Sequence, residues 1–214
     1  MRHGLVVGGV MVLMAAGGAA WGQCGQRWES TSTPPGVIGN VWDLERMPDG
    51  DVIVAGSFTH VGGLRAANLA RFDVQTQTWD AFGAGADALV RQLVRLPDGR
   101  VVATGEFRFI DTQPLTGLAV YDGVQWSPAP AAPPVRYIES MQVGPDGSLW
   151  ISGFNTGPVV TGVWRGDLTT WTRMGDAPYG QLAISPTGEV ALLAARNQGP
   201  FVESAVRRWN GTTW

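Results

Sequence analysis

The sequence has no lysine and a single cysteine. All fifteen basic residues are arginine, they form no long run, and the formal net charge is −3 at pH 7. Because a nucleic acid or an anionic membrane binds to a clustered positive surface, neither partner is expected. One cysteine cannot form an intrachain disulfide, so packing has to stabilise the fold. We interpret Cys24 as an incidental thiol near a terminus, and an intermolecular bridge or a modification site is the alternative.

Long hydrophobic runs are also missing. The apolar run Leu5 to Ala16 is shorter than the roughly 20 residues that span a bilayer. It follows a short basic start and precedes small residues, which is typical of a secretory signal peptide over residues 1–22, with cleavage after Ala20 or Gly22. The remaining residues, 23–214, suffice for one domain without a membrane span. We expect this mature domain to be secreted, or otherwise periplasmic or extracellular.

Side chains suited to catalysis or metal binding are scarce. His60 is the one histidine after the predicted signal peptide, and no nucleophile motif surrounds it. Structural zinc needs four ligands, which the histidine and cysteine content cannot supply. Asp43 and Glu45 are spaced to point the same way on one strand, but the matching residues of later repeats are not acidic. We therefore predict no catalytic residue, no metal site and no cofactor.

What the sequence does contain is a repeat with a period of about 45 residues. The tripeptide Pro-Asp-Gly occurs three times and then once as Pro-Thr-Gly, and a tryptophan follows each of them at a similar distance. The turn markers are Pro48 and Gly50, Pro97 and Gly99, and Pro145 and Gly147, and the tryptophan markers are Trp28, Trp79, Trp126, Trp171 and Trp214. Counted from tryptophan to tryptophan, the units are 28–78, 79–125, 126–170 and 171–213.

Each unit contains the signals of four short antiparallel strands. The turn x-Pro-Asp-Gly favours a hairpin between the first two strands, as in "RMPDGDVIVAGSF". A variable loop then leads to a third strand that ends in an aromatic residue, namely Phe72, Tyr121, Trp164 or Trp209. A short turn follows, such as Asp-Gly or Asn-Gly, and the fourth strand begins at the marker tryptophan. The predicted fold class is all-β, a β-propeller-like array of four-stranded antiparallel blades.

The repeat resembles those of secreted bacterial β-propellers of the delta-sixty and kelch-like type. The resemblance rests on "LPDG" followed by "GEF" in the second unit, and on "ARFD" before a tryptophan in the first. The third unit, with "GPDGSLWISG", is similar to the repeats of two-component-regulator propellers. The resemblance covers Trp28 to Trp214, although the doubled glycine of true kelch repeats is missing. It implies the fold and says almost nothing about activity.

Two arrangements of the four units are open. In one, the segment Gln26–Thr31 completes the last blade beside "RRWNGTTW" and closes a small four-bladed ring. In the other, the chain is a truncated part of a larger propeller with six or seven blades, because it stops on Trp214 at the start of an outer strand.

The strand order places the Pro-Asp-Gly turns on one rim and the variable loops on the other. Since binding residues usually lie on loops held by a rigid scaffold, the candidate ligand-binding residues are His60, Arg65, Arg108, Asp111, Asn155, Arg196 and Asn197. We interpret the recurring tryptophans as packing between blades. The predicted function is a secreted, non-catalytic scaffold that binds an unknown extracellular protein or glycan. An extracellular polysaccharide-active hydrolase or lyase and a fragment of a sensor ectodomain are the alternatives.

Overall fold

The computed structural model describes residues 36–155, 160–198 and 201–214, with residues 195–198 and 201–204 described by their backbone only. The predicted signal peptide, Cys24, Trp28 and the segment Gln26–Thr31 lie outside the described residues. All regular elements in the described part of the chain are β-strands, and all their pairings are antiparallel. The predicted all-β class is confirmed.

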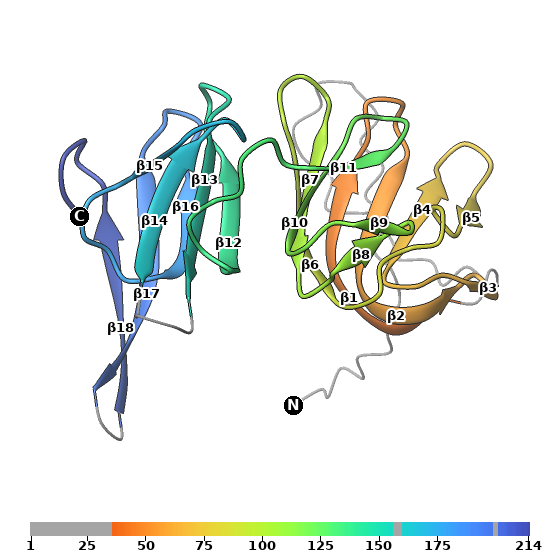
Figure 1. Cartoon of the computed structure of the whole chain (residues 1–214), viewed down its shortest axis with the longest axis horizontal. Coiled ribbons are helices and arrows are strands. Elements are labelled where there is room, and N and C mark those ends of the chain that lie inside the picture. The colour runs from red at the N-terminus through yellow and green to blue at the C-terminus, as the bar shows by residue number, and fades with distance from the viewer. Residues whose placement is uncertain (1–35, 156–159, 199–200) are drawn as a thin grey trace, which may run out of the picture.

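The strands form four successive sheets (Figure 1). The first sheet contains β1 (Val37–Arg46), β2 (Val52–Val61), β4 (Leu69–Asp73) and β5 (Thr78–Asp80), with the short β3 (Leu64–Arg65) paired to β2. The second contains β6 (Val90–Arg95), β7 (Val101–Gly105), β10 (Leu118–Tyr121) and β11 (Trp126–Pro128). The third contains β12 (Tyr137–Val143), β13 (Leu149–Phe154), β14 (Thr161–Gly166) and β15 (Trp171–Arg173). The fourth contains β16 (Gly180–Ile184), β17 (Val190–Gln198) and β18 (Phe201–Arg208), and β8 (Phe109–Ile110) and β9 (Gln113–Pro114) form a separate hairpin.

The marker tryptophans lie in the outermost strands. Trp79, Trp126 and Trp171 belong to β5, β11 and β15, as the sequence predicts, and the described residues of the fourth sheet form three strands, with Trp214 after them. A unit counted from tryptophan to tryptophan therefore contributes the outer strand of one sheet and the inner strands of the next. The indole nitrogen of Trp171 donates to the carbonyl oxygen of Ala131, in the preceding connection, at 3.1 Å.

One predicted equivalence in the third strands is wrong. Phe72 and Tyr121 pair with the first residues of β2 and β7, but Gly166 takes that place in the third sheet, and Trp164 lies two residues earlier, opposite Ile151. The ring of Trp171 lies over Gly166 instead, where an added Cβ would be 2.6 Å from the ring.

The sheets stand in a row, with the first and the fourth at opposite ends (Figure 1). Their innermost strands β1, β6, β12 and β16 are neighbours in that order. The Pro-Asp-Gly turns also follow one another: a Cβ on Gly99 would lie 3.2 Å from Cγ of Pro48, and one on Gly147 would lie 3.1 Å from Cγ of Pro97. These turns therefore share one rim, with the proline of one sheet against the turn glycine of the next.

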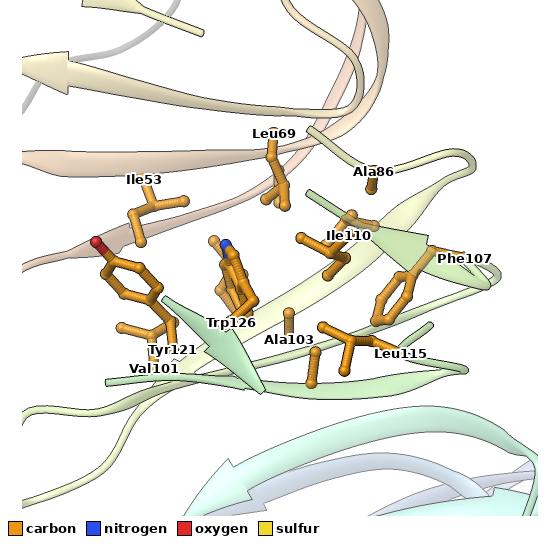
Figure 2. Packing of buried hydrophobic residues seen from close by; sticks show 14 of the residues in the cluster. Ile53, Leu69, Ala86, Val101, Ala103, Phe107, Ile110, Leu115, Tyr121 and Trp126 are labelled. Carbon is orange, nitrogen blue, oxygen red and sulfur yellow. The ribbon is translucent and has the colours of Figure 1, made fainter. Parts of the chain in front are cut away.

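Each gap between neighbouring sheets is filled by apolar side chains. Between the first two sheets, Ile53 and Leu69 face Val101, Ala103 and the ring of Trp126 (Figure 2). Two further clusters fill the gaps between the second and third sheets and between the third and fourth. Because the inner strands meet apolar surface on both faces, their sequences are nearly continuous apolar runs, and strict alternation is lost.

Candidate functional site

The first three innermost strands each contain a β-bulge at the same place of the repeat. The pairing register shifts between Val41 and Asp43, between Val90 and Gln92, and between Ile138 and Ser140. The extra residues are Trp42, Arg91 and Glu139, which we call the bulge row. A bulge leaves its extra residue outside the ladder and redirects its side chain. Strand β16 pairs in regular register and lacks this extra residue.

The residue after each bulge fastens its sheet to the next one. The carboxylate of Asp43 accepts a hydrogen bond from the Leu93 amide at 2.8 Å, and the hydroxyl of Ser140 accepts one from the Leu182 amide at 3.0 Å. Gln92 makes two bonds: its Nε2 donates to the carbonyl oxygen of Met141 at 2.7 Å, and its Oε1 accepts from the Met141 amide at 2.8 Å. Three different side chains thus perform one structural task.

The three side chains of the bulge row differ in chemistry, although they stand at the same place of the repeat. The side chain of Trp42 is 52% exposed, and the guanidinium of Arg91 lies 5.4 Å from the centre of its ring. Arg91 also lies 3.5 Å from a carboxylate oxygen of Glu106, and a carboxylate oxygen of Glu139 lies 3.4 Å from Nε2 of Gln181. An exposed indole beside a guanidinium can stack on a planar or sugar-ring ligand and attract an anionic group.

Of the predicted loop residues, two arginines are exposed and the histidine is half-buried. Arg65, in β3, and Arg108 both have exposed side chains. The backbone amide of Arg108 donates a hydrogen bond to a carboxylate oxygen of Asp87 at 2.8 Å. His60 is half-buried near the end of β2, where its Nδ1 lies 3.0 Å from the hydroxyl of Thr59. Arg196 and Asn197 lie in β17, and their side chains are outside the described part.

Asp111 and Asn155 are occupied by hydrogen bonds that hold the loop rim together. The carboxylate of Asp111 accepts from the Ala84 amide at 2.9 Å, across two loops. Asn155 accepts from the Arg136 amide at 2.6 Å and donates to the carbonyl oxygen of Pro134 at 3.1 Å. In this structure both side chains link neighbouring segments through hydrogen bonds. Contact of any of the seven predicted loop residues with a ligand stays a prediction.

The opposite rim contains a shallow depression of about 420 Å³ between the first two Pro-Asp-Gly turns, lined by Pro48, Arg95, Leu96, Pro97, Asp98 and Gly99. Most of these residues are fixed by the geometry of the turn itself, and the site is open to solvent. The bulge row is the stronger candidate because its side chains differ at one fixed backbone position.

Burial raises the pKa of both Asp43 and Glu45, and hydrogen bonds oppose this shift. For Asp43 the opposing bonds come from the amides of Leu93 and Leu44, and for Glu45 the nearby guanidinium of Arg95 is the largest opposing influence. These acids lie at the junction of the first two sheets, where their oxygens already accept backbone hydrogen bonds.

The described residues also bear on metal sites and on membrane spans. They contain no group of three or more His, Cys, Asp or Glu side chains that could hold a metal ion. No helix long and apolar enough to cross a membrane is found in the same residues.

Residues 48–74 match a family described as a domain of unknown function (DUF5122) beta-propeller. The match runs from the first Pro-Asp-Gly turn to just after β4, and so covers strands β2, β3 and β4 of the first sheet but not its innermost strand β1. A comparison with curated proteins gives no match.

Among solved structures, the extracellular domain of a hybrid two-component system from B. thetaiotaomicron is similar, with 10% sequence identity and a TM-score of 0.43. The aligned part covers 78% of this chain and 28% of that one, so this chain spans less than a third of the length of that domain. The repeated antiparallel sheets, together with the family match over residues 48–74, support a β-propeller-like arrangement of this chain.

Proposed function

We propose that this protein is a non-catalytic scaffold that acts outside the cytoplasm and binds an extracellular protein or glycan on the bulge row. The observation that carries the proposal is a contrast between neighbouring positions. The side chain after each bulge accepts a hydrogen bond from a backbone amide of the next sheet. The bulge residue itself is Trp42, Arg91 or Glu139, and within the described residues its side chain makes no such bond. A rigid framework that repeats, with side chains that do not, is the usual arrangement of a binding surface.

The first two members of the bulge row form a contact suited to recognition. The half-exposed indole of Trp42 offers one face to a ligand, and Arg91 retains donors beyond those facing Glu106. Stacking on an aromatic ring and contact with an exposed cation are each worth about 0.5–1.5 kcal/mol, so the pair can contribute about 1–3 kcal/mol to binding. The exposed side chains of Arg65 and Arg108 on the loop rim could extend such a surface.

A polysaccharide-active enzyme is supported less well. Its acid–base pair would be Asp43 and Glu45, whose raised pKa values suit a general acid. However, both oxygens of Asp43 accept amide hydrogen bonds at 2.8 Å, and Glu45 faces Arg95 at 3.8 Å. These contacts give the two acids a structural role, and we therefore favour binding over catalysis.

The binding proposal can be tested with an array of neutral and anionic oligosaccharides and with a displayed peptide library. We expect the wild-type protein to retain one class of probe, and Trp42→Ala and Arg91→Ala each to weaken that binding about tenfold. Val124→Ala is the matched control, because Val124 is 86% exposed on a turn far from the bulge row. Equal affinity of all four proteins for every retained probe would remove the bulge row from the proposal.

The location outside the cytoplasm rests on the predicted signal peptide and is tested separately. After expression in a bacterium, the exported protein should begin at Trp21 or Gln23, as read by mass spectrometry of its N-terminal peptide. An intact N-terminus on protein that stays in the cytoplasm would contradict this part of the proposal.

A further inference from the structure

The turn that follows the third strand of each sheet is built around one side-chain oxygen. In the first three sheets this oxygen belongs to a carboxylate, which accepts hydrogen bonds from the backbone amides two and three residues later at 2.8–2.9 Å. The aspartates that supply it are Asp73, Asp122 and Asp167. In the fourth sheet Asn210 takes this place, and its Oδ1 accepts from the amides of Thr212 at 2.9 Å and Thr213 at 2.8 Å.

The donors of this turn suit a negative charge. Hydrogen bonds hold the pKa of all three aspartates below the ordinary value. For Asp73 and Asp122 the largest cause is the backbone amide three residues later. For Asp167 the hydroxyl of Thr169 lowers the pKa most, and the amide of Thr170 comes next. The repeat therefore places a stabilised carboxylate at this turn, and the neutral carboxamide of the fourth sheet is the exception.

Asn210 precedes Gly211, and the two form the only Asn-Gly pair of the sequence. Asparagine is thermolabile because the backbone nitrogen of the next residue can attack its side-chain carbonyl carbon, and a following glycine hinders this attack least. Both residues are exposed, and a Cβ on Gly211 would meet no atom within 4 Å. Among the described residues the Gly211 amide donates no hydrogen bond, so its nitrogen is available for the attack.

The hydrogen bonds of the fourth turn also favour the reaction itself. Attack on Cγ of Asn210 moves negative charge onto Oδ1, to which the amides of Thr212 and Thr213 already donate. Donors fixed at an atom where negative charge develops lower the barrier to its formation. Nδ2, the nitrogen that has to leave, donates to the hydroxyl oxygen of Thr213 at 3.1 Å, and this hydroxyl can supply a proton to it.

We propose that Asn210 is a modification site, at which deamidation converts the carboxamide into a carboxylate. The Gly211 nitrogen loses its proton and bonds to Cγ, the bond from Cγ to Nδ2 breaks, and ammonia leaves with that proton. Water then opens the cyclic imide. Opening at Cγ gives an aspartate on the original backbone, and opening at the backbone carbonyl gives an isoaspartyl linkage that can close again. The aspartate is the residue that the other three sheets have at this place, so it completes the fourth turn. This proposal does not depend on the binding function.

The first test follows the purified, folded protein during warm incubation at neutral pH. Samples are digested with trypsin, and the peptide that begins at Trp209 is analysed by mass spectrometry. Asn210 should change to the acid at least about tenfold faster than Asn40 and Asn155 of the same sample, which precede bulkier residues. A synthetic peptide with the sequence "RRWNGTTW" contains the same pair without the turn, and should react no faster than the folded protein.

The second turn offers a matched variant. Asp122 precedes Gly123, whose φ of 102° is close to the 100° of Gly211, and Asp122→Asn creates a second Asn-Gly pair in the same backbone. Both amide donors at 2.8 Å remain, but Gln125 stands where the fourth turn has the hydroxyl of Thr213. The new pair should therefore deamidate faster than Asn40 and more slowly than Asn210.

The product is tested with Asn210→Asp. Its melting temperature should exceed that of wild type above the ordinary aspartate pKa of about 3.9, and the gain should be lost as pH falls through the lowered pKa.

Four results would overturn the proposal. Conversion of Asn210 no faster than that of Asn40, or slower in the folded protein than in the peptide, would show that the turn protects the carboxamide. A lower melting temperature of Asn210→Asp at pH 7 would show that the carboxylate does not fit. The triplet Asn-Gly-Thr is also an acceptor for N-linked glycans, and a glycan mass on this peptide would assign Asn210 to a different modification.

Discussion

The link between the second and third sheets gives the sharpest test of how this array is stabilised. Gln92 makes two hydrogen bonds to the backbone of Met141, 49 residues further along the chain. A hydrogen bond of this kind contributes about 0.5–1.5 kcal/mol net, so Gln92→Ala should lower the free energy of unfolding by about 2 kcal/mol. Unfolding in urea, followed by tryptophan fluorescence, measures this difference.

Gln181→Ala is the matched control, since it removes the same side chain from the same place of the repeat. Gln181 is exposed, and its contacts with Glu139 are long, at 3.4 and 3.5 Å. Its replacement should change stability by less than about 0.5 kcal/mol. Equal losses in the two variants would refute the reasoning that the second sheet is tied to the third through Gln92.

A second readout follows the bond directly. The Met141 amide donates to Gln92, so its hydrogen exchange should accelerate in Gln92→Ala before global unfolding occurs. In Gln92→Glu, the carbonyl of Met141 and partial burial raise the pKa of the new carboxyl group, which donates a hydrogen bond only when protonated. The loss of stability relative to wild type should therefore be smallest below the ordinary glutamate pKa of about 4.3 and grow as pH rises through the raised value.

Three further predictions concern other contacts. Burial raises the pKa of Asp43 above 3.8, so stability from its protonated form is lost as pH rises through the raised pKa; Asp43→Asn, whose Nδ2 cannot accept the Leu44 or the Leu93 amide, should be less stable than wild type in urea titrations, but by less at pH 7 than at pH 3. Arg71→Met leaves the buried carboxylate of Asp51 without its partner at 2.7 Å and should cost about 1–2 kcal/mol, whereas Arg100→Met, at an exposed pair, should cost less than about 0.5 kcal/mol. A Cβ on Gly56 would overlap a carbonyl oxygen of the facing strand, so Gly56→Ala should lower the melting temperature, with a loss of about 1–3 kcal/mol, and an unchanged melting curve would contradict this packing.

The hairpins could be predicted because their signals are local. Proline presets the backbone of a turn, and the residues after it form dense β-rich runs, so the first two strands of each sheet follow from the sequence. The marker tryptophans located the outermost strands for the same reason, since each follows a short turn. Trp164 was misplaced because its position depends on the ring of Trp171 packed over Gly166, which is a contact between strands.

The bulges were missed because they are set by the neighbouring sheet. Asp43, Gln92 and Ser140 share no side-chain chemistry, but each reaches a backbone amide of the following sheet. A weak signal does exist in the sequence. In "VWDL", "VRQL" and "IESM" the apolar residues are three apart, where a regular strand facing one core would place them two apart. Such a break in alternation, repeated in successive units, indicates an extra residue at a fixed place.

The contacts of equivalent residues separate structural positions from binding positions. Where a neighbouring sheet fixes a side chain, as at Leu93 or Gln92, its exposure is low or its polar atoms are paired. Where no neighbour fixes it, as at Trp42, the residue type is free to serve a ligand. Trp42→Ala should therefore weaken ligand binding without lowering the melting temperature, and Gln92→Ala should do the reverse. If Trp42→Ala altered both properties, the bulge row would also stabilise the array, and its residue types would not be free to serve a ligand.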